Sequence, residues 1–304
     1  KRPGSLLTSG IEHASIYEPL LNLKLKGFKI KITGTEANGV IDPEDFAAKL
    51  DKSTTFVSIM HVNNETGAIQ PVEKTCRQIR IKEREYGRKI HIHCDAVQSF
   101  GKLPVLPESL DVDSLAVSGH KIGAPRGAGI LYLKKSLEVL YRGGGQENEI
   151  RPGTENLFAI HGLALAAEKW NSETDTWHAA AQTLRNHLID GITRSGGRFI
   201  DPAYSANAAQ YSPYIVLASF APIPGEVLVR VMNDRGFCIS TGSACSSKGN
   251  KNTRVLEQMG LDHRFAAGVI RISIGQDTTI DECTMFLDAL EEETRCLKQE
   301  IRGL

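Results

Sequence analysis

The stretch SLAVSGHKIGAPRGAGILYLK, Ser114 to Lys134, places a short apolar segment before a lysine and a glycine-rich loop, and a second apolar segment after them. Both apolar segments have the length and the β-branched or aromatic content of strands. We therefore predict two strands, Ser114 to Lys121 and Gly127 to Lys134. In open α/β sheets ligands bind where strands end, so Lys121 is expected beside a site.

The chain before this stretch alternates between two patterns. TFVSIMHV (residues 55–62) and KIHIHCDA (residues 89–96) are typical of strands. PVEKTCRQIRIKEREYG (residues 71–87) is typical of a helix that begins at a proline and ends at a glycine. Strands that alternate with helices predict an α/β fold with a mainly parallel sheet.

The rest of the chain has a different order of elements. Apolar spacing from about Leu157 predicts a long helix that could join two domains. Strands are predicted at residues 212–220, 236–241 and 269–275, and helices at residues 225–236 and 280–301. We therefore expect a large domain at residues 1–160. The connecting helix and a smaller α+β domain are expected at residues 161–304.

Composition restricts the classes of partner. The 304 residues include 36 basic and 36 acidic side chains, so net charge favours neither nucleic acid nor an anionic membrane. No run of 18 apolar residues occurs, and KRPGSLLTSG does not resemble a secretory signal. Six scattered cysteines without a CxxC pair favour reduced thiols and a cytoplasmic protein over a disulfide framework or a metal site.

Four polar residues are expected to converge on one edge of the sheet. A partly desolvated Lys121 near other cations is a candidate nucleophile towards an aldehyde, although a surface lysine at a strand end fits the local pattern as well. A buried Asp95 needs a cation such as a protonated pyridine nitrogen, or else the residue is a helix cap or a loop ligand. With Asn64 and Gln98, these residues suit a cofactor that carries an aldehyde, a ring nitrogen and a phenolic oxygen.

Six motifs together carry a resemblance to a known family. They are HVNNETG, CDAVQSFGKLPV, SGHKIGAPRGAGILYL, RPGTEN, STGSACSS and IRISIG, in this order. The chain resembles pyridoxal-phosphate enzymes of the class V aminotransferase group over nearly its whole length, and most of all cysteine desulfurases of the NifS-like type. The resemblance implies an aspartate aminotransferase-like fold and pyridoxal 5′-phosphate as cofactor.

The resemblance also implies roles for residues around the cofactor ring. Lys121 would be the Schiff-base lysine, and Asp95 would pair with the pyridine nitrogen. Gln98 and Asn64 would hold the region of the phenolic oxygen, with Asn64 also near the substrate. His13 would stack on the ring, whereas the stretch alone is equally compatible with a residue on a helix face.

Phosphate and substrate residues follow in the same way. Ser118 and His120 would bind the cofactor phosphate, and Thr154 would reach the phosphate of a partner subunit, which implies a homodimer. Arg271 would clamp the substrate carboxylate with its bidentate fork. Without the motif, a structural salt bridge would be the simpler interpretation of this arginine.

Cys245, in ISTGSACSSK, would be the nucleophile. The resemblance implies removal of sulfur from L-cysteine, which yields L-alanine and an enzyme persulfide. A sulfur-acceptor or scaffold protein would then take the sulfur for iron–sulfur cluster assembly or thiolation. The polar segment KGNKNTRVLEQMG, which begins at Lys248, either contacts that acceptor or forms a solvated turn.

One feature of the family is not found in this sequence. Its members carry a segment ahead of the position of LLTSGIEH that cradles the cofactor phosphate at a helix start. We expect that the natural protein is longer. The alternatives are an inactive sulfur-relay binding protein, or another class V enzyme such as a selenocysteine lyase or an aminotransferase. A Rossmann protein is excluded, because RGGGQENE does not provide G-x-G-x-x-G after a strand.

Overall fold

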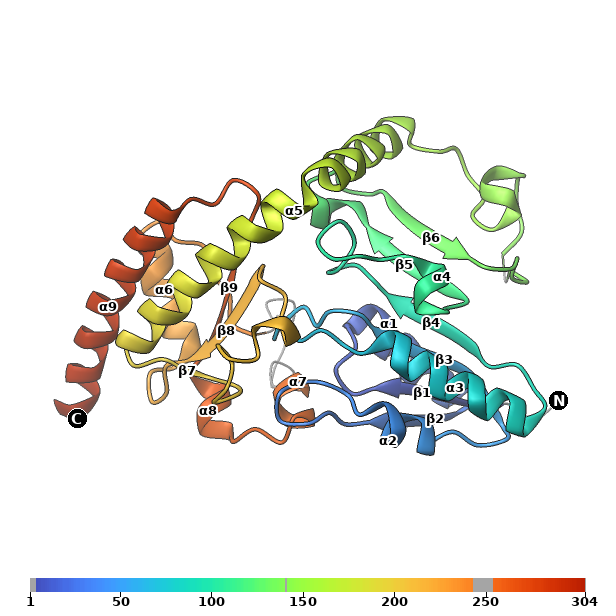
Figure 1. Cartoon of the computed structure of the whole chain (residues 1–304), viewed down its shortest axis with the longest axis horizontal. Coiled ribbons are helices and arrows are strands. Elements are labelled where there is room, and N and C mark those ends of the chain that lie inside the picture. The colour runs from blue at the N-terminus through green and yellow to red at the C-terminus, as the bar shows by residue number, and fades with distance from the viewer. Residues whose placement is uncertain (1–3, 140, 243–253, 304) are drawn as a thin grey trace.

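The computed structural model describes residues 4–139, 141–242 and 254–303. The chain forms a larger and a smaller part, and helix α5 (Leu157–Arg194) runs from one to the other (Figure 1). The long helix predicted from about Leu157 is therefore confirmed. The expected boundary after residue 160 falls in the first turn of α5 and stays a prediction.

The larger part is built on a six-stranded sheet in the order β2-β1-β3-β4-β5-β6. Its strands are β1 (Ser5–Ser9), β2 (Lys29–Thr33), β3 (Thr54–Met60), β4 (His91–Asp95), β5 (Ser114–Ser118) and β6 (Gly129–Leu133). The first five are parallel and β6 is antiparallel to β5, which confirms the mainly parallel sheet. The strand predicted at residues 114–121 ends early, because residues 119–122 form the 3₁₀ turn η1 (Gly119–Ile122).

Four helices accompany this sheet. They are α1 (Ala14–Leu25), α2 (Pro43–Ala48), α3 (Val72–Tyr86) and α4 (Pro107–Leu110). Helix α3 lies within the predicted range, and Gly87 ends it with a φ of 65° that suits glycine. Successive strand residues point to opposite faces. Thus Leu7 and Val57 enter the core with α2 and α3, while Leu6 and Phe56 face α1.

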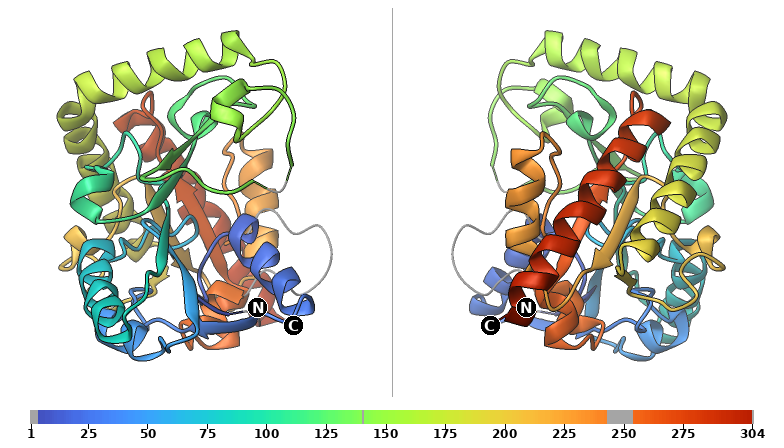
Figure 2. Two further views of the ribbon diagram at one scale, coloured as in Figure 1. Left: turned by 90° about the vertical axis from the view of Figure 1, so that its right-hand side faces the viewer. Right: turned by 90° about the vertical axis from the view of Figure 1, so that its left-hand side faces the viewer.

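The smaller part has a three-stranded antiparallel sheet in the order β7-β8-β9. Its strands are β7 (Arg198–Phe199), β8 (Ile215–Ser219) and β9 (Val269–Ser273), and its helices are α6 (Gly225–Asp234), α7 (Arg254–Gln258), α8 (His263–Ala267) and α9 (Ile280–Gly303). Helices α5, α6 and α9 pack together against this sheet (Figure 2). The helices predicted at residues 225–236 and 280–301 and the strands at residues 212–220 and 269–275 are confirmed.

The strand predicted at residues 236–241 is wrong. Only Ser240 pairs there, in an isolated bridge with Arg271. Phe237 and Ile239 pack instead against the apolar core of the smaller part. The alternation that suggested a strand therefore reflects side-chain burial without a ladder of backbone hydrogen bonds.

The two parts are also joined beside the sheet edge. Ile69 donates its N–H to the carbonyl of Gln210, and Ser212 donates to the carbonyl of Gly67, each at 2.8 Å. A shared apolar cluster includes Ile11, Met60, Ala68, Tyr211, Leu217 and Val255. The turn that follows β3 is thus fixed to the smaller part, which brings residues from both parts to one site.

Candidate active site

Polar residues lie at the carboxyl ends of four neighbouring strands. His13 follows β1, Asn64 follows β3, Asp95 ends β4, and Lys121 lies in η1 after β5. The strands are parallel and their ends are in register, since Met60 pairs with Asp95, and Asp95 pairs with an alanine of β5. The carboxyl ends therefore meet at one edge, the usual position of a ligand in an open α/β sheet.

Asp95 is a buried carboxyl at the centre of this edge. Its side chain is 7% exposed, and Oδ1 accepts the Val97 N–H at 3.0 Å. Burial raises the pKa of Asp95, while the Val97 hydrogen bond and the charge of His13 lower it. A buried carboxylate is costly without a partner, so this position suits a cation. The Val97 hydrogen bond also ties Asp95 to the loop after β4, as the alternative of a loop ligand implies.

His13 caps the start of α1 and does not lie on the helix face. Its Nδ1 accepts the Ser15 N–H at 3.2 Å. Arg254 of α7 holds the turn before it, donating to the carbonyl oxygens of Gly10 and Glu12. The guanidinium carbon of Arg254 also lies 4.1 Å from the ring centroid of Tyr17. The position of His13 is thus set from both parts of the molecule.

Glu12, directly before His13, is a functional candidate that sequence reasoning missed. This fully buried carboxyl accepts hydrogen bonds from Ser9 Oγ at 2.7 Å, Ser58 Oγ at 3.3 Å and the Met60 N–H at 2.7 Å. Burial raises its pKa to about 7, and the Asp95 charge adds to that increase. Glu12 ties the end of β1 to β3 beside Asp95. An acid next to His13 was the only signal in the sequence.

Asn63 forms the turn that presents Asn64. The Asn63 side chain is completely buried, its Oδ1 accepts the N–H groups of Glu65 and Thr66, and its Nδ2 donates to the Ile11 carbonyl at 3.0 Å. Asn64 is left half-buried at the sheet edge. This arrangement agrees with the turn-forming tendency of the polar cluster.

Arg271 reaches the same turn from the smaller part. Its Nη1 donates to the Asn64 carbonyl at 3.0 Å, although 207 residues separate the two positions. Its backbone pairs with Ser240 through an N–H···O distance of 2.6 Å. The structure therefore brings the Arg271 side chain to the backbone of Asn64.

The part of the site that follows β5 is more exposed to solvent than the parts that follow β1 and β3. Ser118 Oγ lies 2.7 Å from His120 Nδ1, while His120 and Lys121 are exposed. Trp170 of α5 donates from Nε1 to the Ile122 carbonyl at 3.0 Å and so fixes the end of η1. Ser118 and His120 hydrogen-bond each other, which leaves one N–H or O–H of the pair to donate to an anion such as phosphate.

A second lysine lies near Lys121. Burial, followed by the charge of Lys121, lowers the pKa of Lys102 to about 8. The Lys102 Nζ lies 5.5 Å from the ring centroid of Tyr214. Sequence reasoning missed this lysine, because its motif GKLP indicates no contact with η1. Gln98 lies half-buried in the turn after β4, between Asp95 and this lysine in sequence.

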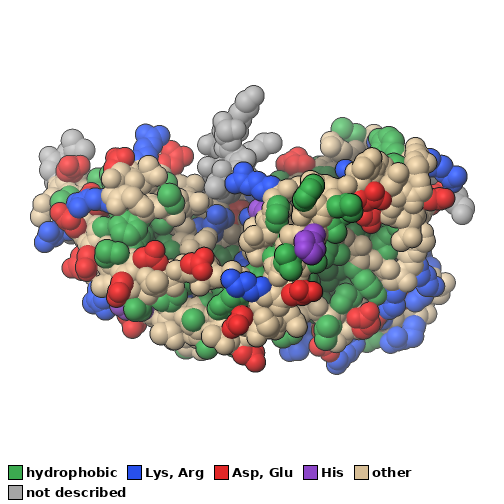
Figure 3. Space-filling view, turned by 90° about the horizontal axis from the view of Figure 1, so that it is seen from above, with side chains coloured by type: hydrophobic (Ala, Val, Ile, Leu, Met, Phe, Trp, Pro, Cys, Tyr) green, Lys and Arg blue, Asp and Glu red, His purple; other side chains and the backbone are tan. Residues whose placement is uncertain are grey.

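Thr154 is exposed on the segment that leads into α5. Large apolar side chains are exposed on β6 and around this segment, namely Ile130, Leu131, Tyr141, Leu157 and Phe158. We call these five residues the β6–α5 face. Figure 3, seen from above, shows hydrophobic side chains at the surface of both parts. Large exposed apolar side chains are typical of protein contacts where they form a contiguous patch.

Cys245 lies outside the described residues. The described chain stops at Gly242, which is buried beside the Glu65 carboxyl, and resumes at Arg254 on the His13 turn. Gly242 and Arg254 are therefore both close to the edge of the larger sheet. The five described cysteines, Cys76, Cys94, Cys238, Cys283 and Cys296, have free thiols.

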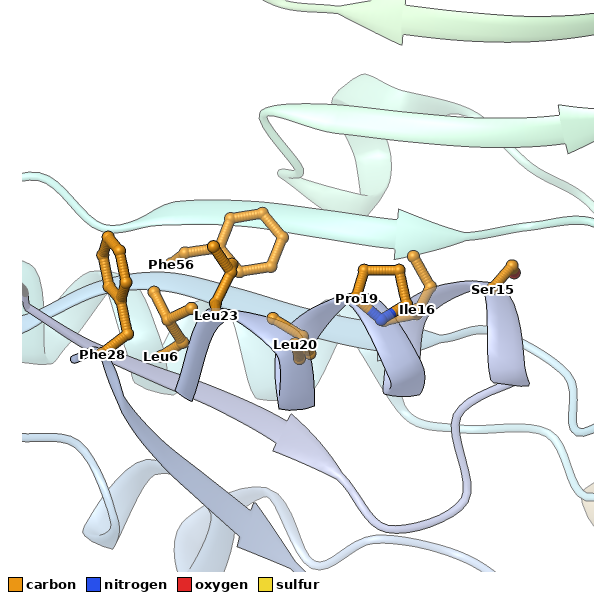
Figure 4. A pocket seen from close by; sticks show the side chains of 8 residues that line it. All are labelled: Leu6, Ser15, Ile16, Pro19, Leu20, Leu23, Phe28 and Phe56. Carbon is orange, nitrogen blue, oxygen red and sulfur yellow. The ribbon is translucent and has the colours of Figure 1, made fainter. Parts of the chain in front are cut away.

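A cavity of about 340 Å³ lies elsewhere, between α1 and the sheet (Figure 4). Its lining is apolar apart from one serine and consists of Leu6, Ser15, Ile16, Pro19, Leu20, Leu23, Phe28 and Phe56. It has no ionisable side chain, so it offers neither a charge partner nor a nucleophile. The chemistry belongs at the sheet edge.

The residues at that edge fit pyridoxal phosphate. A buried carboxyl at Asp95 matches a protonated ring nitrogen, and the amine of Lys121 matches an aldehyde. The Ser118–His120 pair offers a donor for a phosphate. Asn64 follows β3 at the same edge of the sheet as these groups.

Comparison with known proteins identifies the family of this chain. The family model "Aminotransferase class-V" matches residues 1–286. A "Cysteine desulfurase IscS" from Dictyoglomus turgidum is 35% identical over 288 residues, which cover 94% of this chain and 71% of that protein.

Solved structures show the same likeness. A "NifS-like protein" superposes with a TM-score of 0.87 and 36% identity over 96% of this chain and 75% of its own. A structure of "SspA in complex with cysteine" gives a TM-score of 0.74 and 29% identity over 92% of this chain and 76% of its own. In the part of the chain that the structure describes, no helix is long and apolar enough to cross a membrane.

Proposed function

The chain belongs to the class V aminotransferase family, and we propose that it is an L-cysteine desulfurase dependent on pyridoxal 5′-phosphate. The observation that carries this proposal is the meeting of two groups of residues at one sheet edge. Asp95 and Lys121 suit the cofactor, and Arg271 suits an amino-acid carboxylate beside Asn64. Relatives named cysteine desulfurase support the choice of substrate.

The cofactor would be held by residues of the larger part. When bound, pyridoxal phosphate supplies an electron sink for bond cleavage at the substrate. Lys121 would attach it, Asp95 would pair with its ring nitrogen, and His13 would stack on the ring. Gln98 and Asn64 would bind near its phenolic oxygen. The phosphate would be bound by Ser118, His120 and the partner subunit's Thr154.

Substrate binding would use the smaller part. Arg271 would form two parallel hydrogen bonds to the L-cysteine carboxylate, as a planar guanidinium can. Its hydrogen bond to the Asn64 carbonyl orients the guanidinium before substrate arrives. The carboxylate would thus be held at a fixed distance from the ring-binding residues, which favours reaction over unproductive binding.

Cys245 would take the sulfur. Its thiolate attacks the substrate sulfur, the carbon–sulfur bond breaks, and the carbon gains a proton to yield L-alanine. The sulfur remains on Cys245 as a persulfide, and a sulfur-acceptor or scaffold protein receives it for cluster assembly or thiolation. The free thiols of the other cysteines suit a reducing compartment, which favours the cytoplasm.

A second copy of the chain would cover the β6–α5 face. Phe158 is 91% exposed and Leu157 is 71% exposed, in the same segment as Thr154. Burial of such side chains is worth about 1.5–3 kcal/mol each. A homodimer formed through this face would also carry Thr154 towards the partner's phosphate site.

The experiment supplies L-cysteine and a reductant to the cofactor-loaded protein and measures sulfide and L-alanine. Equal amounts of both products are expected, and Cys245→Ala should bind the cofactor normally but release no sulfide. Amino transfer to a keto acid without sulfide would instead support an aminotransferase. Faster turnover of selenocysteine than of cysteine would favour a selenocysteine lyase, and failure to bind the cofactor would favour an inactive binding protein.

A further inference from the structure

The mechanism above does not use Glu65, although this residue lies within the site. Its side chain is 7% exposed, and Asn63 Oδ1 holds its backbone N–H at 2.9 Å. The carboxyl oxygen Oε2 is buried, and no described residue donates a hydrogen bond to it. A buried carboxylate oxygen without a donor is costly, so such a group is expected to exchange a proton or to balance a nearby charge.

The groups around Glu65 show which nearby charges its carboxyl could balance. Two cations act on the carboxyl, Arg254 from α7 and Arg271 from β9. Arg271 donates to the carbonyl of Asn64, the residue directly before Glu65. On a third side, Oε2 lies 3.5 Å from the position that a Cβ on Gly242 would occupy. Glu65 is thus enclosed by the same elements that place Arg271.

Opposing effects act on the pKa of Glu65. Burial raises the pKa of Glu65 to about 7, and the charges of Arg254 and Arg271 oppose that increase. A carboxylate that binds Arg271 would bring a like charge near Glu65 and offset part of the arginine's field. Both effects raise the pKa of a neighbouring acid. Binding of an anion at Arg271 and protonation of Glu65 are therefore coupled.

We propose, on the basis of the proposed function, that Glu65 is a positioning residue that takes up a proton from solvent when the substrate carboxylate binds Arg271. With Glu65 neutral, the positive charge of Arg271 is not divided between Glu65 and the substrate carboxylate. With Glu65 ionised, two carboxylates share its field. Because the pKa is higher in the complex than in the free protein, affinity is greatest below pH 7 and falls as pH rises through 7.

Calorimetry of L-alanine binding to the cofactor-loaded protein tests this coupling. L-alanine keeps the substrate carboxylate but has no sulfur to lose. Titrations at pH 7 in two buffers of different ionisation enthalpy give the number of protons taken up. The wild type should take up about half a proton more than Glu65→Gln. Its dissociation constant should rise up to about tenfold more than that of the variant between pH 6 and pH 8.

The matched control is Glu73→Gln, which changes an exposed carboxyl on α3 paired with Arg77. It should behave as the wild type does. Equal proton uptake by the wild type and Glu65→Gln would overturn the inference while leaving the desulfurase proposal intact. Failure of the loaded wild type to bind L-alanine would instead overturn the proposed function, and with it the premise of this inference.

NMR of ¹³C-labelled glutamate carboxyls provides a readout that needs neither activity nor a variant. Two side-chain signals, from Glu12 and Glu65, should titrate near pH 7 in the wild type. One of them should shift its midpoint upward by about one unit when L-alanine binds the loaded protein. If neither midpoint moves, the inference is wrong even if Glu65→Gln cannot be folded.

Discussion

The two sides of the site differ in how completely the chain encloses them. Around β1 and β3, Glu12 and Asn63 are fully buried, and side chains from the smaller part bind the backbone of both turns. After β5, His120 and Lys121 are exposed, as is Thr154 ahead of α5. One side of the site is thus completed within a single chain, while the other lies open.

The difference has a physical cause. The enclosed side lies where the two parts of the molecule meet, so hydrogen bonds from β9 and α7 cross-link it. The open side is held by α5 through the Trp170–Ile122 hydrogen bond and adjoins the exposed β6–α5 face. We infer that contacts within the chain set the substrate end of the site, and that a partner subunit completes the phosphate end.

The strongest test of the open side is Lys121→Ala. Loss of the attaching amine should abolish the visible absorbance of bound cofactor and lower L-alanine formation by on the order of 10³-fold. Absorbance spectra and product assays measure both effects. Lys102→Ala is the control and should retain the attached cofactor. If only Lys102→Ala loses that attachment, Lys102 and not Lys121 is the attaching lysine.

Glu12→Gln probes the enclosed side through its pH dependence. The Glu12 pKa is raised from 4.5 to about 7 in the folded chain. The unfolded chain therefore ionises first, and folded-state stability is lost as pH rises from about 4.5 through 7. This loss amounts to about 3 kcal/mol for one carboxyl. Urea unfolding at pH 5 and pH 7.5 should show a smaller decrease for Glu12→Gln than for the wild type.

In this experiment Glu73→Gln, on the surface of α3, should keep the full decrease of the wild type. An equal decrease in the wild type and Glu12→Gln would show that Glu12 does not ionise near neutral pH. The absolute stability of Glu12→Gln at pH 5 is also expected to fall, because glutamine has one acceptor oxygen where the carboxyl has two, so one of the three hydrogen bonds is lost or reversed.

Phe158→Asp tests whether the open side is closed by a second copy. Placing a charge at the centre of an apolar interface should weaken dimerisation by about 2 kcal/mol, or roughly 30-fold. Sedimentation velocity over a range of concentrations measures this change. Leu25→Asp is the control, since Leu25 is 87% exposed at the end of α1, away from the β6–α5 face. Dissociation by Leu25→Asp alone would place the interface on the other side of the molecule.

Trp170→Phe should have the smallest effect. It keeps an aromatic ring but removes the hydrogen bond to the Ile122 carbonyl, which is worth about 1 kcal/mol. We expect a several-fold lower kcat with nearly unchanged KM, because η1 carries Lys121 while Arg271 is held elsewhere. Trp177→Phe, which changes the neighbouring ring, should leave kcat unchanged. A change confined to KM would contradict the inference that η1 positions the cofactor-attaching lysine and does not position the substrate-binding arginine.

Much of the fold was predictable because its signals are local. The helix at residues 72–86 and the strands at residues 55–60 and 91–95 follow from apolar spacing and flanking Pro and Gly. Strands β1 and β2 were not predicted, since five residues of SLLTS or KIKIT carry little periodic information. The false strand at residues 236–241 arose because burial produces the same alternation with or without a ladder.

The candidate site divides in the same way. Lys121, Asp95 and Asn64 could be identified because they follow predicted strands and lie in motifs that resemble a known family. Glu12, Glu65 and Lys102 were not assigned a role, because a charged letter in a sequence does not show whether its side chain is buried. The structure adds that information through the partners and the burial of each group.

By itself the sequence determined the α/β class, the family resemblance and the order of the site residues along the chain. Only the tertiary structure decided that Arg271 binds the turn of Asn64, that Arg254 holds the turn before His13, and that two acids are buried beside them. The reason is physical. Strand and helix patterns depend on neighbours a few residues away, whereas burial and ionisation depend on groups that packing brings together from more than 200 positions apart.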